Sequence, residues 1–119
     1  MNDLSLLTEL QLRFRDERDW KQFHTLKNLI VSLNLEAAEL LELTQWQTDA
    51  QLEARKDDPS LRQPLADECA DVLLYLVLVA EAGGIDLMQA AREKIEKNAR
   101  KYPAALVAGK AGAPPEPSI

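Results

Sequence analysis

The chain has 119 residues, of which 46% are hydrophobic, so it can form one small domain with a buried core. Its net charge of -6 disfavours a nucleic-acid polymer or an anionic membrane as a partner, because both require basic surfaces. The single cysteine, Cys69, excludes an intrachain disulfide, and the longest apolar run, 72–80, is too short to span a membrane. We expect a cytoplasmic protein, since the residues after Met1 show no signal-peptide pattern.

Four helices are predicted, because apolar residues recur at helical spacing and Gly and Pro interrupt the chain at only a few places. The expected ranges begin after Asp3 or Ser5 and are about 5–18, 25–55, 64–82 and 86–102. Pro59 marks the loop between the second and third helices, and Gly83 with Gly84 ends the third.

These elements predict an all-α fold, a four-helix bundle over residues 1–103, followed by a flexible tail rich in Ala, Gly and Pro over 104–119. The third helix is apolar on nearly all sides along 72–80. Three amphipathic neighbours cannot cover such a helix in a monomer, so we expect a homo-oligomer.

Two pairs of carboxylates stand out on consecutive predicted helices. Glu36 and Glu39 lie on the second helix, and Glu68 and Asp71 lie on the third. In both pairs the i, i+3 spacing places the two side chains on one face of the helix. The first residue of each pair falls on the apolar stripe, which predicts that both pairs turn toward the interior.

Four converging carboxylates repel one another unless they are protonated, paired or neutralised by a cation. The sequence has no Lys or Arg between Lys27 and Arg55, or between Arg62 and Arg92. A hard divalent cation with oxygen ligands, Mg²⁺ above all, therefore fits best. A single acidic pair is usually just a solvated surface, and the prediction depends on there being two.

Other chemistries are disfavoured. A di-iron bundle needs a Glu-x-x-His pair on each of two helices, and the only histidine is His24. No histidine lies near Cys69 in the sequence, and the chain has no glycine-rich phosphate loop of the GxxxxGK type.

The ordered motifs resemble the all-α nucleoside triphosphate pyrophosphohydrolases, the MazG-like superfamily, and within it the dCTP pyrophosphatase branch. The resemblance runs over about residues 5–103 and is carried by FRDERDWKQFH (14–24), NL (28–29), EAAEL (36–40), QW (45–46), ECADVLLYL (68–76), KIEKN (94–98) and KYP (101–103). It departs from the family at Leu35, where many members have a further Glu, and at Gln11, where dCTP-directed relatives often have His.

The resemblance implies Mg²⁺-dependent hydrolysis between the α and β phosphates of dCTP or a modified dCTP, in an assembly such as a tetramer. It implies that Glu36, Glu39, Glu68 and Asp71 hold the metal and carry out catalysis. It assigns to substrate binding Trp20, His24, Asn28, Trp46, Tyr75, Lys94, Asn98 and Lys101. The same chemistry on dUTP or another pyrimidine nucleotide remains open, as does a non-catalytic helical oligomerisation module.

The two tryptophans have alternative readings, since a tryptophan in a helical protein often fills the core. Trp46 follows Glu36 by ten residues. In a continuous helix this places its ring near the same face, ~15 Å along the axis at ~1.5 Å per residue. That distance suits a nucleotide whose phosphates lie at the carboxylates and whose base lies at the ring.

Overall fold

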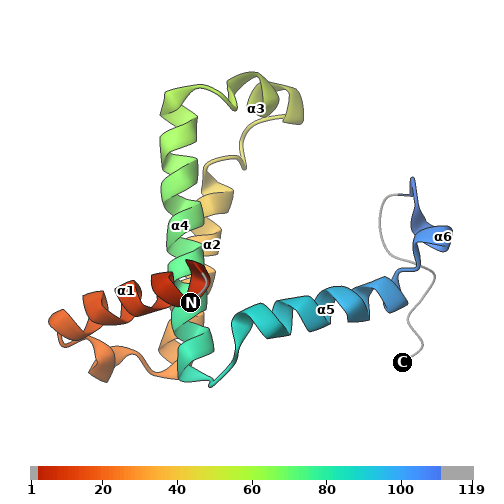
Figure 1. Cartoon of the computed structure of the whole chain (residues 1–119). Helices are drawn as coiled ribbons and strands as arrows, with labels where there is room; N and C mark the ends of the chain where they lie inside the picture. The colour runs from red at the N-terminus through yellow and green to blue at the C-terminus, as the bar shows by residue number, and fades with distance from the viewer. Residues whose placement is uncertain (1–2, 111–119) are drawn as a thin grey trace. The chain divides into compact units, whose positions relative to one another are not determined.

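The computed structural model describes residues 3–110, and every regular element in that range is helical, as the sequence predicts (Figure 1). The chain divides into two compact units, one up to Ile85 and one from Asp86 onward. None of the helices in the described range is both long and apolar enough to cross a membrane. The elements are α1 (Asp3–Glu17), the 3-10 helix η1 (Lys21–Phe23), α2 (Leu26–Glu42), α3 (Asp49–Arg55), α4 (Pro59–Ala82), α5 (Leu87–Lys101) and α6 (Ala104–Val107).

The predicted second helix, 25–55, is wrong in its second half, because α2 ends at Glu42 and α3 starts only at Asp49. Thr48 caps α3: its hydroxyl accepts a hydrogen bond from the backbone N–H of Gln51, and the Gln51 side chain accepts one from the Thr48 N–H. This capping box is a helix start signal in the sequence that the apolar periodicity overrode in our prediction.

The predicted start of the third helix at Pro64 is also wrong, because α4 begins at Pro59. Asp58 caps the helix by accepting a hydrogen bond of 2.9 Å from the backbone N–H of Ser60. Pro59 occupies the first helical position, where a missing N–H costs nothing. We expected Asp58 and Pro59 to lie in the loop before the helix, but they form its N-terminus.

The first unit is built on α2 and α4, which lie side by side and run in opposite directions, with α1 packed against α4 (Figure 1). The buried apolar residues of the described chain are few: Leu29, Leu61, Val77, Leu78 and Ala80. Three of them lie in the predicted apolar run 72–80. The antiparallel pair fixes which faces of α2 and α4 meet, and these faces carry Glu36 and Glu68. Glu39 is exposed, so the prediction that both acidic pairs turn toward the interior is wrong for this residue.

The second unit contains α5, whose start at Asp86 and end before Pro103 agree with the predicted fourth helix. The Asp86 carboxylate accepts a hydrogen bond of 3.1 Å from the backbone N–H of Gln89. Residues 104–107 form the short helix α6 at the start of the predicted tail, and 111–119 lie outside the described residues. Because α5 belongs to a separate unit, the four-helix bundle stays a prediction.

Candidate functional site

Three of the four predicted carboxylates meet between α2 and α4. Glu36 and Glu39 come from α2 and Glu68 from α4, and one carboxylate oxygen from each lies within 4.8 Å of the others. We call these three residues the acidic cluster. Asp71, one turn further along α4, lies outside this group of oxygens, but its charge acts on both Glu36 and Glu68.

The acidic cluster is electrostatically strained in the absence of a cation. Burial, reinforced by contact with the Glu39 and Glu68 carboxyls and by the charges of Glu39 and Asp71, raises the pKa of Glu36 from its ordinary 4.5 to about 7. Burial also raises the pKa of Glu68, although contact with the Glu36 carboxyl opposes the shift. One oxygen of Glu36 and one of Glu68 are buried without a hydrogen-bonding partner among the described residues.

The donor set suits a hard divalent cation. All of its atoms are carboxylate oxygens, which such ions prefer. None of the ion pairs found within residues 3–110 involves a member of the acidic cluster, so no Lys or Arg there neutralises the charge. The unpartnered oxygens of Glu36 and Glu68 are therefore free to coordinate an ion.

A pocket of about 270 Å³ opens between α1, the turn that follows it, and α4. Its lining residues are Gln11, Phe14, Arg15, Trp20, His24, Asp71, Leu74, Tyr75 and Leu78. Asp71 connects the two features, because it lines the pocket and its charge reaches the cluster. A ligand in this pocket therefore lies next to the predicted cation site.

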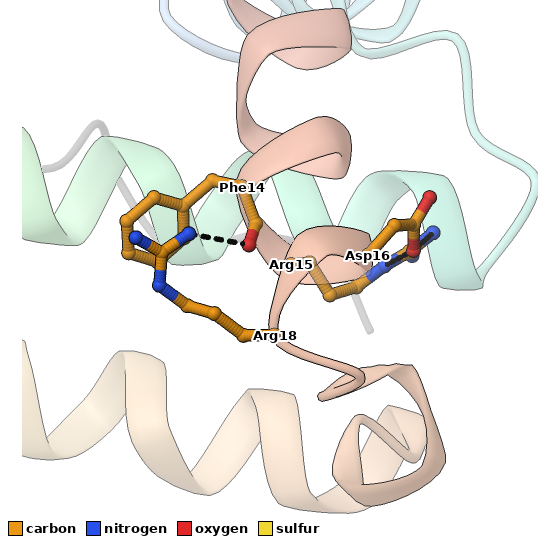
Figure 2. Close-up of polar contacts among 4 residues, drawn as sticks. All are labelled: Phe14, Arg15, Asp16 and Arg18. Atoms are coloured by element: carbon orange, nitrogen blue, oxygen red, sulfur yellow. Dashed lines mark hydrogen bonds and ion pairs between the residues drawn. The ribbon is translucent and has the colours of Figure 1, made fainter.

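The pocket combines apolar walls with a few polar groups. Burial, followed by the nearby charge of Arg15, lowers the pKa of His24, so this imidazole is neutral at physiological pH. Its Nδ1 atom is buried and has no hydrogen-bonding partner among the described residues. The Arg15 guanidinium pairs with Asp16 at 2.8 Å (Figure 2) and thereby lowers the pKa of that carboxyl. The unpartnered Nδ1 of His24 is thus available to a ligand.

The predicted substrate-binding residues fall into separate groups. Trp20, His24 and Tyr75 all line the pocket. Asn28 lies in the first turn of α2, where its side chain donates a hydrogen bond of 3.2 Å to the carbonyl of Phe23. The remaining three, Lys94, Asn98 and Lys101, lie on α5 in the second unit.

The structure places Trp46 neither on a continuous helix with Glu36 nor in a core. It follows the end of α2, in the turn before α3, so the continuous helix that would align it with Glu36 does not exist. Its side chain does not line the pocket, and the residue is 88% exposed, which excludes a core role within this chain.

Sequence reasoning did not assign several pocket residues to binding, and of these Arg15 matters most because it is the only cation in the lining. A signal was available: Gln11, Phe14 and Arg15 have the i, i+3, i+4 spacing of one helix face. Leu74 and Leu78 continue the α4 side of the pocket from Asp71 at the same spacing, and they read as ordinary core residues in the sequence.

Comparison with known proteins gives consistent matches. The model of the MazG-like family matches residues 31–107. The chain is 40% identical over 105 residues to dCTP pyrophosphatase 1 of Rattus norvegicus, covering 88% of this chain and 62% of the relative. It is 42% identical over 100 residues to the Homo sapiens protein of the same name, covering 84% and 59%. The chain therefore spans about three fifths of the length of these relatives.

A solved structure is also similar. A pyrophosphatase from Archaeoglobus fulgidus superposes with a TM-score of 0.77 at 38% sequence identity. The match covers 87% of this chain and 94% of that protein, so nearly all of the archaeal fold has a counterpart here.

Proposed function

The chain belongs to the MazG-like family, and from this premise we propose that it is a nucleoside triphosphate pyrophosphohydrolase that converts dCTP or a modified dCTP to dCMP and pyrophosphate. Its proposed role is housekeeping of the cytoplasmic nucleotide pool. The observation that carries the proposal is the position of Asp71, which lines the pocket and acts on the acidic cluster. The names of the relatives support the choice of dCTP.

Mg²⁺ is the proposed cofactor, held by Glu36, Glu39, Glu68 and Asp71. When bound, it neutralises the triphosphate and raises the acidity of the attacking water. The reaction adds water across the α–β anhydride: an oxygen joins the α phosphorus, and pyrophosphate leaves. We assign acceptance of the water's proton to Glu39, the exposed member of the acidic cluster.

The pocket is proposed to bind the nucleoside end of the substrate. Its volume of about 270 Å³ is small beside the ~300–1,000 Å³ typical of ligand pockets, so it suits a base and sugar better than a whole triphosphate. Trp20 offers an aromatic surface to the base, and Tyr75 lies one helical turn beyond Asp71, where a ring can disfavour a ribose 2′-hydroxyl. The unpaired Nδ1 of His24 supplies a hydrogen-bonding group, with Asn28 nearby in the chain.

The remaining proposed contacts are Trp46 and the α5 residues Lys94, Asn98 and Lys101, which would add aromatic surface and positive charge in a homo-oligomer, most simply a tetramer. Large apolar side chains support assembly, because many are open to solvent in the single chain. Phe23 and Leu35 are each 61% exposed, and Leu41 is 60% exposed. Burying them against another copy would remove this apolar surface from water.

Incubation of the protein with each common nucleotide and Mg²⁺, followed by separation of the products, tests the proposal. We expect dCMP and pyrophosphate from dCTP, and no turnover by Glu36→Gln or Glu68→Gln. Preferential cleavage of dUTP would support the alternative substrate. Absence of turnover with every nucleotide would support the non-catalytic module, and near-normal activity of either variant would contradict the assigned cluster.

A further inference from the structure

Helix α1 ends in a turn with a residue in an unusual backbone conformation. The backbone N–H of Trp20 donates to the carbonyl of Arg15, and that of Asp19 donates to the carbonyl of Asp16, each at 3.1 Å. This nested pair of hydrogen bonds is the Schellman motif, and it requires a left-handed residue just after the helix. Asp19 fills that position with φ of 54°, where glycine is the usual residue.

The Schellman motif folds the chain back so that Trp20 lies against α1. The Trp20 ring meets the Phe14 ring edge to face, with centroids 5.8 Å apart and an interplanar angle of 73°. A hydrophobic contact between these two positions commonly accompanies the motif. Because both rings line the pocket, the backbone conformation of Asp19 sets the position of one pocket wall.

Two further side chains hold this arrangement. The Arg18 guanidinium lies 3.6 Å from the centroid of the Phe14 ring and donates a hydrogen bond of 2.9 Å to the Phe14 carbonyl (Figure 2). The Gln22 side chain donates to both the carbonyl and the carboxylate of Asp19, at 3.0 Å each. Both contacts are local, so they act on the turn and the ring rather than on the core between α2 and α4.

We infer that Asp19 and Arg18 are positioning residues that fix Trp20 in the pocket wall and so set the affinity for the nucleoside end of the substrate. Asp19 acts through its left-handed backbone, and Arg18 acts through the Phe14 ring on which Trp20 rests. The inference rests on the proposed function in one respect, namely that Trp20 contacts the base.

Variants of Asp19 separate backbone conformation from side-chain chemistry. Glycine and asparagine adopt a left-handed conformation readily, whereas a β-branched residue does not. Trp20→Ala removes the ring and should raise KM for dCTP about 5- to 150-fold, the range for loss of a base–aromatic contact. Asp19→Val should raise KM in the same direction with kcat largely kept, while Asp19→Gly and Asp19→Asn should retain the KM of the unmodified protein.

Arg18 has a matched control on the same helix, the exposed Arg13. Arg18→Ala should raise KM about 2- to 5-fold, the equivalent of an exposed cation–π contact, and Arg13→Ala should leave it unchanged. An equal effect of the two substitutions would show that Arg18 acts only through its general charge, which would overturn its positioning role.

A spectroscopic readout tests the turn independently of substrate. In a Trp46→Phe background, Trp20 is the only tryptophan, because the chain has two. Its near-UV circular dichroism should weaken in Asp19→Val and persist in Asp19→Gly, with the far-UV helical signal unchanged in both. If Asp19→Val does not fold, Asp19→Ala replaces it, since alanine is less strained at this position.

The outcomes distinguish the two proposals. An unchanged KM for Trp20→Ala would remove the base contact from the proposed function, whereas the near-UV signal would still report whether Asp19 fixes the ring. A raised KM for Trp20→Ala, together with an unchanged KM and near-UV signal for Asp19→Val, would overturn the positioning role alone. An equal rise of KM for Asp19→Gly and Asp19→Val would overturn it too.

Discussion

The raised pKa of Glu36 makes the stability of the metal-free protein depend on pH. In the folded chain this carboxyl titrates at about 7 and in the unfolded chain near 4.5, so the folded state keeps a proton that the unfolded state releases. Between these two values the unfolded state binds fewer protons, and the free energy of unfolding therefore falls as pH rises. Below pH 4.5 the effect vanishes, and above about pH 7 it is complete.

The size of this effect on the free energy of unfolding follows from the difference between the folded and unfolded pKa values of Glu36. At ~1.4 kcal/mol per pH unit the full effect would be about 3.5 kcal/mol, and solvent screening at a half-buried carboxyl reduces it to on the order of 1–2 kcal/mol. For a chain of 119 residues, 1 kcal/mol corresponds to about 4 °C in Tm. We therefore expect metal-free Glu36→Gln to melt about 4–8 °C above the unmodified protein at pH 8 and close to it at pH 4.5.

Thermal unfolding followed by circular dichroism, in a chelating buffer, measures this difference. Glu42→Gln is the matched control, because Glu42 is an exposed glutamate at the end of the same helix. Added Mg²⁺ should raise the Tm of the unmodified protein at pH 8 and leave that of Glu36→Gln nearly unchanged. If the Tm of Glu36→Gln and that of Glu42→Gln changed with pH in the same way, the assignment of Glu36 to a strained acidic cluster would be refuted. An equal rise of Tm with Mg²⁺ in both variants would refute it too.

Three further predictions follow from the exposed and pocket residues. Trp46→Ala should raise KM for dCTP about 5- to 150-fold, the range for loss of a base–aromatic contact, without loss of the helical signal, because the residue is 88% exposed in the single chain; a large loss of Tm with normal KM would contradict this. Tyr75→Ala should narrow the preference for dCTP over CTP, which kinetics on both nucleotides would measure, and an unchanged ratio would remove Tyr75 from the sugar site. Light scattering at micromolar concentration should give a multiple of the 13.3 kDa protomer mass, and a monomeric mass would contradict the proposed assembly.

Three of the four carboxylates that the sequence predicted to converge do meet, because their chemistry and spacing constrain each other. Glu36 and Glu68 occupy the apolar stripes of two long helices, and the surrounding sequence lacks cations that could pair with them. When α2 and α4 pack side by side, apolar stripes must face each other, and the carboxylates are carried with them. This part of the geometry required no knowledge of the loops.

The loops explain what the sequence did not predict. The apolar spacing continues through the turn after Glu42, so periodicity alone extended α2 to Arg55. Local hydrogen bonds end α2 earlier than that. The Thr44 hydroxyl donates to the Leu41 carbonyl, and Thr48 caps the next helix. Side chains that bond to nearby backbone compete with the helix, and a pattern of hydrophobicity does not register this competition.

The shape of the pocket depends both on helical spacing and on the conformation of the turn after α1. Its α4 side follows from helical spacing, since Asp71, Tyr75 and Leu78 recur at four and three residues on one face. Its opposite side depends on where the chain turns after α1, and that turn depends on one residue with positive φ, Asp19. Amphipathic helices can thus place the charges of this site, whereas the wall proposed to face the base requires a backbone conformation that helical periodicity does not encode. Changes of substrate preference among proteins of this design are therefore expected to arise in the segment 14–24 more readily than in the carboxylate pairs, whose geometry is fixed by the packing of α2 on α4.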